Sequence, residues 1–211
     1  MRLGPPRVAP MGERAILVTF AERIDPVANA RARALADAWE TRRVGPAVPA
    51  YASTLLHFDP LRISGTRAAA LARRLASDGV VGRGRTRTIE IPVRYDGPDL
   101  ADVARLSSLT VAELIALHSG AEYVAYFLGF MPGFAYLGEL DTRITAPRLP
   151  EPRLRVPSGS VGVAGRQTAV YPFASPGGWR LIGSTDVVLF DVRRDPPSLV
   201  GEGDRVRFVR R

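Results

Sequence analysis

From residue 123 to its end, the chain is built of short apolar runs separated by glycine, proline, aspartate and serine. Runs of six to nine residues at this spacing are typical of β-strands joined by tight turns, and they are too short for most helices. This half of the chain therefore favours a β-sandwich or a closed β-barrel. The runs are residues 122–130, 160–165, 168–173, 179–184, 186–192 and 204–211.

The first part of the chain has a different pattern. Residues 14–20 and 51–60 are rich in β-branched and aromatic side chains and predict strands. Asp25 and Pro26 predict the start of a helix between them, because aspartate caps helices and proline suits the first helical position. A second helix is expected after residue 65, with Gly79 as its C-terminal cap. This alternation predicts a small α+β sandwich.

Both helices carry apolar residues at helical spacing, which predicts the face that each one buries. The predicted buried residues are Val27, Ala30, Ala34, Leu35 and Ala38 in the first helix, and Ala68, Leu71, Ala72 and Leu75 in the second.

Residues 80–88 are rich in glycine and arginine and have little to bury, so we place a domain boundary there. The prediction is an N-terminal α+β domain of residues 1–85 and a barrel domain of residues 86–211. The barrel domain is expected to begin with a strand over residues 88–95.

A short helix is expected to follow over residues 109–120. Thr110 and Glu113 have the spacing of a capping box, and Gly120 is a stop signal. His118 falls on the apolar face of this helix and is expected to point inward.

Composition removes several kinds of chemistry. All 29 basic residues are arginine, and cysteine and lysine are both absent from the sequence. Disulfides, thiolate nucleophiles, Schiff bases and P-loop lysines are therefore excluded, and with only two histidines we expect no histidine-rich metal site. The net charge of +8 is spread along the chain, so we expect no nucleic-acid partner. Because no run is long enough to span a membrane, we expect no membrane partner and a cytoplasmic protein.

Three glycine-rich loops are the candidates for a binding site: residues 130–138, 157–172 and 175–179. Their aromatic faces and backbone N–H groups could line a pocket. The glycines at 159, 162 and 165 precede Arg166, which leaves two interpretations open, a phosphate-binding loop and a glycine-rich barrel turn. Glu139 and Asp141 could act as general bases, but nothing pairs them with a nucleophile.

Taken together and in this order, the loops "GFMPGFAYLG", "PRLRVPSGSVGVAGRQTAVYP" and "SPGGWRLIG", followed by "DPPSLVGEGDRVRF", closely resemble the KipI family. Its members are also described as the B subunit of 5-oxoprolinase or as allophanate hydrolase subunit 1. The resemblance extends to "GERAILVTF", "PAYASTLLHFDP" and "IPVRYDGPDL", and so covers nearly the whole chain.

The resemblance implies a small N-terminal α+β domain and a C-terminal cyclophilin-like closed β-barrel. It implies that the chain works with a KipA-like C subunit. In 5-oxoprolinase these two work with an A subunit, and the three together open 5-oxo-L-proline to glutamate with hydrolysis of ATP. Little activity is then expected from the chain alone. The alternatives are the carboxyltransferase component of an allophanate hydrolase or urea carboxylase, and a KipI-like inhibitor of a histidine kinase.

On this interpretation the three loops surround a small carbonyl substrate. His118, Gln167, Thr168 and Tyr171 are the predicted catalytic residues, and Arg148 or Arg153 would bind a carboxylate or phosphate. The other predicted substrate-binding residues are Phe130, Pro132, Gly133, Phe134, Tyr136, Gly165, Arg166, Pro176, Gly177, Gly178 and Trp179.

The chain departs from the family pattern at three positions. Ala135 and Ser158 are mild changes. Ser184 stands where the family commonly has arginine, so this chain has a hydroxyl group where relatives have a cation that could bind an anion.

Overall fold

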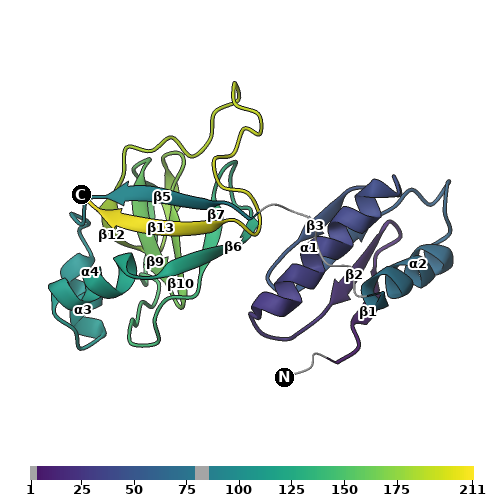
Figure 1. Cartoon of the computed structure of the whole chain (residues 1–211), viewed down its shortest axis with the longest axis horizontal. Coiled ribbons are helices and arrows are strands. Elements are labelled where there is room, and N and C mark those ends of the chain that lie inside the picture. The colour runs from purple at the N-terminus through teal and green to yellow at the C-terminus, as the bar shows by residue number, and fades with distance from the viewer. Residues whose placement is uncertain (1–3, 79–85) are drawn as a thin grey trace. The chain divides into compact units, whose positions relative to one another are not determined.

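The structure is a computed structural model that describes residues 4–78 and 86–211. It divides into two compact units, Met1–Arg85 and Thr86–Arg211 (Figure 1), which we call the N-terminal unit and the barrel unit. Gly79 and most of the predicted boundary segment lie outside the described residues.

The N-terminal unit contains a four-stranded antiparallel sheet and two helices. Helix α1 (Pro26–Thr41) packs against β3 and β4, helix α2 (Gly65–Ser77) packs against β1 and β2, and the two helices contact each other. The strands, in the order β1-β2-β4-β3, are β1 (Arg7–Met11), β2 (Ala15–Thr19), β4 (Ser53–His57) and β3 (Ala47–Pro49).

Helix α1 (Pro26–Thr41) begins where the sequence predicts, because the Asp25 carboxylate accepts hydrogen bonds from the N–H groups of Val27 and Ala28. Its buried face differs in part from the predicted one: Val27 and Ala30 are exposed. The buried residues are Ala28, Asn29, Ala32, Ala34, Leu35, Ala36, Ala38 and Trp39. In an alanine-rich helix the apolar pattern is weak, and the fully buried Trp39 marks the side that faces the sheet.

Helix α2 (Gly65–Ser77) buries Ala68, Ala72 and Leu75, which confirms most of its predicted face. Leu71 is half-buried against the same core.

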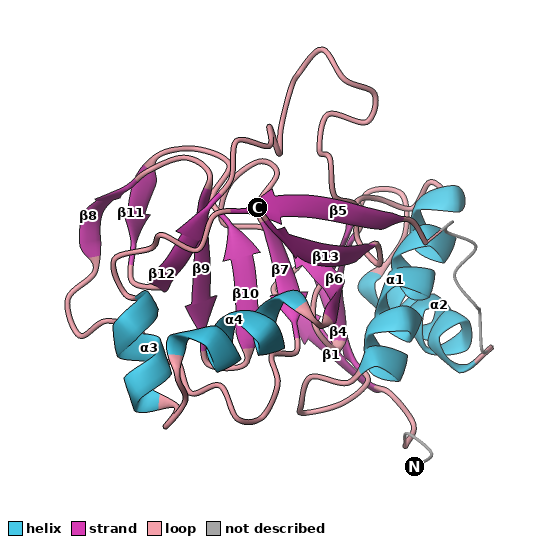
Figure 2. Ribbon diagram, turned by 60° about the vertical axis from the view of Figure 1, so that its left-hand side comes forward, coloured by secondary structure: helices cyan, strands magenta, loops and turns pink. Residues whose placement is uncertain are grey.

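The barrel unit is built on a seven-stranded sheet that nearly closes on itself (Figure 2). In this sheet only β13 and β5 pair in parallel. The strand order is β12 (Arg180–Ser184), β9 (Ser160–Ala164), β10 (Gln167–Val170), β7 (Ala135–Gly138), β6 (Glu122–Leu128), β13 (Arg205–Arg210) and β5 (Thr88–Val93). A separate two-stranded ribbon pairs β8 (Arg153–Val156) with β11 (Ser175–Gly177).

Two helices pack on the barrel, α3 (Leu100–Leu106) against β12 and α4 (Val111–Ser119) against β13. The predicted capping box of α4 is confirmed, since Thr110 and Glu113 bond to each other's backbone N–H groups and Gly120 is the C-terminal cap. Helix α3 was not predicted. The apolar run at residues 186–192 was expected to be a strand, and it is an irregular segment in which Val188 and Val192 are exposed.

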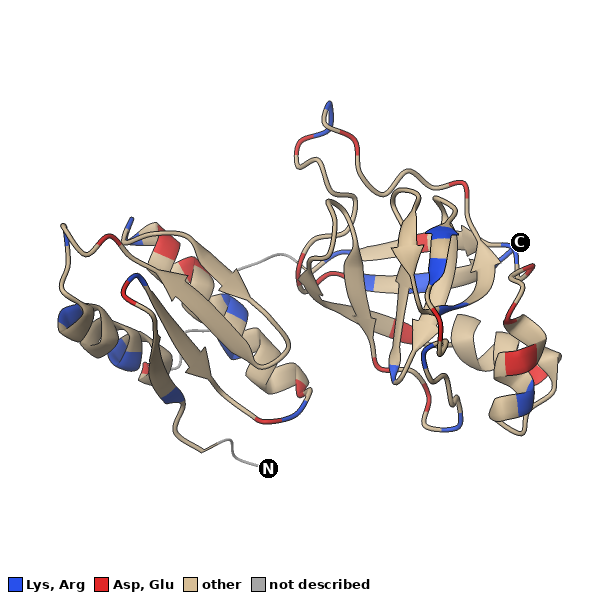
Figure 3. Cartoon of the chain, turned by 180° about the vertical axis from the view of Figure 1, so that it is seen from behind, with Lys and Arg blue, Asp and Glu red and all other residues tan. Residues whose placement is uncertain are grey.

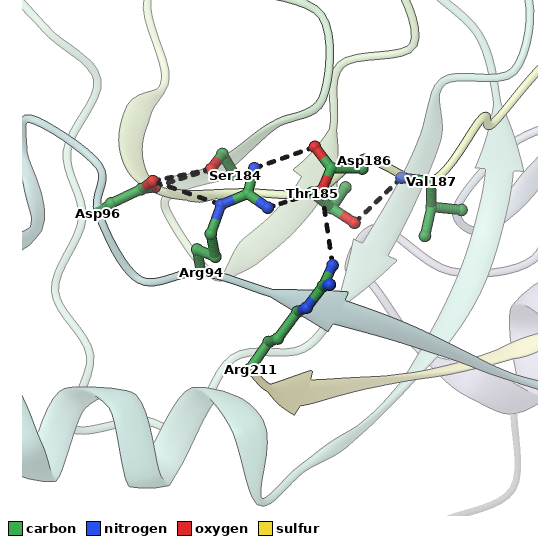
Figure 4. A network of polar contacts seen from close by, with 7 residues as sticks. All are labelled: Arg94, Asp96, Ser184, Thr185, Asp186, Val187 and Arg211. Carbon is green, nitrogen blue, oxygen red and sulfur yellow. Dashed lines mark hydrogen bonds and ion pairs between the residues drawn. The ribbon is translucent and has the colours of Figure 1, made fainter.

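A polar network lies where the first and last strands of the sheet meet (Figure 4). The backbone groups of Arg94 and Ser184 exchange hydrogen bonds of 2.9 and 2.8 Å. The Arg94 guanidinium donates to both carboxylate oxygens of Asp186, at 2.6 and 3.0 Å, and these bonds hold the pKa of Asp186 below its usual value. The Ser184 hydroxyl donates to Asp96 at 2.8 Å, so this serine helps to join β12 to the segment that follows β5.

Candidate functional site

A cavity of about 240 Å³ opens in the barrel unit where the three glycine-rich loops come together. We call it the aromatic cavity. Its walls come from β7 and the turn before it, the segment before β8, the end of β10, β11 and the residues before β12. The lining residues are Phe130, Phe134, Tyr136, Arg148, Pro152, Tyr171, Pro176, Gly177, Gly178 and Trp179. All of them except Pro152 are among the residues that the sequence suggested for a site.

The inner wall is a cluster of aromatic rings, of which Phe134, Tyr171 and Trp179 are buried and Tyr136 is half-buried. Phe134 makes edge-to-face contacts with Tyr136, Tyr171 and Trp179 at centroid distances of 5.0, 5.3 and 5.7 Å. Gly177 is needed here, because a Cβ atom at that position would lie 2.6 Å from the Tyr171 hydroxyl. Burial raises the pKa of Tyr136 and of Tyr171, so both hydroxyl groups stay protonated at neutral pH.

Arg148 is the cation of this cavity that is free to bind a ligand. Within the described residues it makes no hydrogen bond or ion pair with a protein group. Arg153 was the other candidate, but its guanidinium donates to the buried carboxylate of Asp99 at 2.8 Å. Asp99 also accepts a 2.7 Å bond from the Leu181 N–H, which fixes the pair in place. The geometry therefore favours Arg148 as the anion-binding residue.

His118 lies inside the barrel and does not line the aromatic cavity. It is fully buried, and its ring stacks on Phe208 at 4.6 Å. The hydroxyl of Thr168 donates to the carbonyl of Gly162 at 3.1 Å, so its oxygen accepts from His118 Nε2 at 2.9 Å. This assigns His118 Nδ1 as the acceptor of the Tyr95 hydroxyl at 2.8 Å.

The His118 network reaches the strand beneath the cavity wall. Gly162 accepts the bond from Thr168, and a Cβ atom at Gly162 would lie 3.3 Å from both Tyr171 and Trp179. Thr168 is also fully buried. His118 and Thr168 are thus placed to hold strands in position, and they cannot touch a ligand in the cavity.

Burial lowers the pKa of His118 from 6.5 to about 3, which predicts a pH dependence of stability. The unfolded chain takes up a proton below pH 6.5 that the folded barrel excludes, so the stabilisation present above pH 6.5 is lost as the pH falls toward 3. We expect His118 to lower the free energy of unfolding by about 2 kcal/mol between pH 7 and pH 5. Urea unfolding at both pH values measures this loss.

His118→Gln is the control for that experiment, because glutamine does not titrate. The difference between wild type and His118→Gln should shrink by about 2 kcal/mol on going from pH 7 to pH 5. An equal difference at the two pH values would contradict the assignment.

The remaining predicted site residues lie apart from the cavity lining. Arg166 forms an ion pair with Glu139 at 2.7 Å, and Gly165 forms the turn between β9 and β10 at a φ of 56°. Gln167 pairs with Gly138 at the start of β10, and its Nε2 is buried with no hydrogen-bond partner in the described residues. The three glycines of the possible phosphate loop are therefore split between two turns and the middle of β9.

Pro132 and Gly133 belong to the turn before β7. Gly133 adopts a φ of 78°, and a Cβ atom there would lie 2.7 Å from the side chain of Phe190. These two residues shape the turn that carries Phe130 and Phe134.

Sequence reasoning missed two residues near the site. Pro152 lines the cavity beside Gly178, and the only available signal was its place in the proline-rich run before β8. Tyr95 binds His118, but it follows β5 and is 23 residues away in the sequence. No local pattern connects two such positions.

Charged side chains of both signs are interspersed over the two units (Figure 3). No group of three or more histidine, aspartate or glutamate side chains in the described part of the chain could hold a metal ion. Among the same residues, no helix is long and apolar enough to cross a membrane.

Comparisons with known proteins identify the family of this chain. The family model "Carboxyltransferase domain, subdomain C and D" matches residues 6–200. The B subunit of 5-oxoprolinase from Bacillus subtilis is 39% identical over 97% of this chain and 92% of its own length. The B subunit of 5-oxoprolinase from Escherichia coli O157:H7 is 57% identical over 59% of this chain and 58% of its own length.

Solved structures agree in fold. The crystal structure of TTHA0988 matches 94% of this chain at 43% identity with a TM-score of 0.82, and this chain spans 40% of that longer chain. Kluyveromyces lactis urea carboxylase matches 99% of this chain and 23% of its own length, with a TM-score of 0.74 and 19% identity, which shows likeness of fold alone. Because the family model matches most of its length, the chain belongs to the carboxyltransferase-domain family, subdomain C and D.

Proposed function

We propose that this chain is the B subunit of an ATP-dependent amidohydrolase that opens 5-oxo-L-proline to L-glutamate. The similarity to the B subunits of two 5-oxoprolinases supports this assignment. The observation that carries it is the aromatic cavity. Its apolar walls are aromatic rings, and its one arginine, Arg148, makes no hydrogen bond or ion pair with a protein group in the described residues. The further proposals from the family, a cyclophilin-like type of barrel and a two-domain organisation, are supported by the near closure of the sheet and by the two compact units.

The cavity suits a small ring that bears a carboxylate. Its 240 Å³ correspond to the volume of about eight water molecules, which leaves room for 5-oxo-L-proline. Arg148 would bind the carboxylate, and the protonated hydroxyl group of Tyr171 would donate to the ring carbonyl. The apolar ring atoms would pack on Phe134 and Trp179.

The role of this chain in the reaction is to bind and orient the substrate. Hydrolysis adds water to the ring carbonyl, breaks the carbon–nitrogen bond and transfers a proton to the nitrogen. None of the residues that line the cavity is an aspartate, glutamate or histidine. We infer that the acid and base come from a KipA-like C subunit or from the A subunit, and that His118 and Thr168 act as positioning residues.

The aromatic cavity does not fit ATP. A nucleoside triphosphate has roughly three times as many non-hydrogen atoms as 5-oxo-L-proline, and Arg148 is the single cation among the residues that line the cavity. We therefore assign no nucleotide site to this cavity, and ATP would bind elsewhere in the complex.

The second candidate is the carboxyltransferase component of a urea carboxylase. The match of residues 6–200 to a carboxyltransferase-domain family model favours it. The chain itself has no lysine that could carry biotin, so this function would require a biotin carrier on another chain.

The experiment that tests the proposed function uses this chain co-expressed with its KipA-like C subunit, in the presence and in the absence of the A subunit. We expect ADP release that depends on 5-oxo-L-proline and that neither the chain nor its partners produce alone. A folded complex without this activity would point to the carboxyltransferase function. Failure to form a complex would favour the kinase-inhibitor alternative.

Arg148→Met should lower the catalytic efficiency of the complex toward 5-oxo-L-proline. A hydrogen-bonded ion pair with a carboxylate contributes about 1.5–3 kcal/mol, so kcat/KM for 5-oxo-L-proline is expected to fall roughly 10- to 150-fold. Steady-state kinetics of ADP release measure the loss.

Arg155→Met is the matched control. Arg155 is exposed on β8 and does not line the cavity, so its replacement should leave kcat/KM within about twofold of wild type. Equal kinetics for Arg148→Met and Arg155→Met would remove Arg148 from the site.

A further inference from the structure

Phe130 adopts a backbone conformation that bulky residues avoid. Its φ is 72°, in the left-handed region that glycine and asparagine tolerate far better than phenylalanine. The surrounding turn imposes this conformation: the Gly129 N–H donates to the Phe134 carbonyl, and the Phe134 N–H donates to the Met131 carbonyl, both at 3.1 Å. Strain of this kind is retained where it serves a function.

The strained backbone holds an apolar ring at the rim of the aromatic cavity. The side chain of Phe130 lines the cavity, yet the residue is 61% exposed. Its ring meets Phe134 edge to face at 5.4 Å, and Phe134 meets Trp179 in the same manner at 5.7 Å. Phe130 thus extends the buried aromatic cluster outward, from the interior of the barrel to the solvent.

Two unfavourable features therefore coincide at one residue, a strained φ and a solvent-exposed phenyl ring. A ligand in the cavity would cover the inner face of that ring and exclude water from it, which makes the exposed position favourable only in the bound state. Trp179, which is 5% exposed, forms an inner wall of the same cavity.

We propose that Phe130 covers the aromatic cavity and determines its specificity. The phenyl ring of Phe130 would lie over a ligand that has a single small ring. The chemical class of the ligand, a ring carrying a carboxylate, rests on the proposed function. The covering role does not, because it concerns access to the cavity in the free protein.

The first experiment measures that access without any substrate. Acrylamide is a small neutral amide that quenches tryptophan fluorescence on contact, and the chain has two tryptophans. Trp39 is fully buried in the N-terminal unit, so a change at Phe130 is reported by Trp179. Phe130→Gly should raise the acrylamide quenching constant about twofold, because a rim without the ring admits the quencher to the cavity.

Ser108→Gly is the matched control. Ser108 has a φ of 54° and follows α3, outside the cavity, so this variant relieves the same kind of strain without opening the rim. Its quenching constant should equal that of wild type. Phe130→Asn is a second test variant, since asparagine tolerates the left-handed conformation and lacks the ring.

The second experiment measures substrate recognition in the complex that this chain forms with the A and C subunits. Phe130→Gly and Phe130→Asn should raise KM for 5-oxo-L-proline about tenfold, whereas Phe130→Tyr, which keeps the ring, should stay within about twofold of wild type. The melting temperature of Phe130→Gly should be unchanged or higher, because the strain is relieved. A structural role would instead lower it.

The two experiments separate this inference from the proposed function. An unchanged quenching constant in Phe130→Gly overturns the cover, and an unchanged KM in an active complex overturns the specificity role. A wild-type complex that does not turn over 5-oxo-L-proline overturns the proposed function, and the quenching result still decides whether Phe130 covers the cavity.

Discussion

Replacing His118 by alanine is expected to lower the free energy of unfolding of the barrel unit by about 4 kcal/mol. The imidazole is fully buried, stacks on Phe208, and bonds to Tyr95 and Thr168. Alanine would leave a cavity beside Phe208 and remove the partner of the half-buried Tyr95 hydroxyl. Thr168 keeps its bond to Gly162, so part of the network survives. Urea unfolding at pH 7, followed by near-UV circular dichroism, measures the loss.

His57→Ala is the matched control, because His57 is the other histidine of the chain and is half-buried on β4. Its side chain makes no hydrogen bond within the described residues. Its replacement should cost less than about 1 kcal/mol. A loss for His118→Ala as small as that for His57→Ala would contradict the structural role of the buried network.

Local signals predicted the starts and ends of several elements. Asp25 and Pro26 mark the start of α1, and Thr110 and Glu113 mark the start of α4, because a capping residue acts within one turn of the helix. The strand predicted over residues 51–60 contains β4. These features depend only on neighbours in the sequence, and the structure confirms them.

Features that depend on tertiary contacts were missed. Strands β1 and β3 are short edge strands with a proline each, which gives them weak β propensity. The run at residues 186–192 has the composition of a strand but forms no ladder, and an isolated bridge from Phe190 to Ser198 replaces it. Composition records which residues favour strands and cannot say which strand finds a partner.

The candidate site was likewise predicted in part from local signals, and the rest of it depends on tertiary contacts. The glycine-rich and aromatic loops could be recognised as one site because their residue types suit a ligand pocket, and they meet in the aromatic cavity. The choice between Arg148 and Arg153 required the structure, because Asp99 is 54 residues from the arginine that it binds. The distance of His118 from the cavity likewise follows from the barrel, since the inward face of α4 packs against β13.

Gly159→Ala is expected to destabilise the barrel by more than about 3 kcal/mol. Gly159 has a φ of 79°, so any other residue there is strained, and an added Cβ atom would collide with the carbonyl oxygen of Thr185. The backbone cannot retreat, because the Gly159 N–H donates to Tyr171 at 2.8 Å and its carbonyl accepts from Thr185 at 2.9 Å. Tyr171 is a wall of the aromatic cavity, so the substitution should also raise KM for 5-oxo-L-proline in the complex.

Gly165→Ala separates the two causes of that loss. Gly165 also has a positive φ, 56°, but a Cβ atom there meets nothing within 4 Å. It should therefore cost about 1–2 kcal/mol, the strain of the left-handed conformation without a collision. Urea unfolding of both variants at pH 7 gives the comparison. Equal losses would mean that the contact with Thr185 does not constrain the turn, and that φ alone requires glycine at both positions.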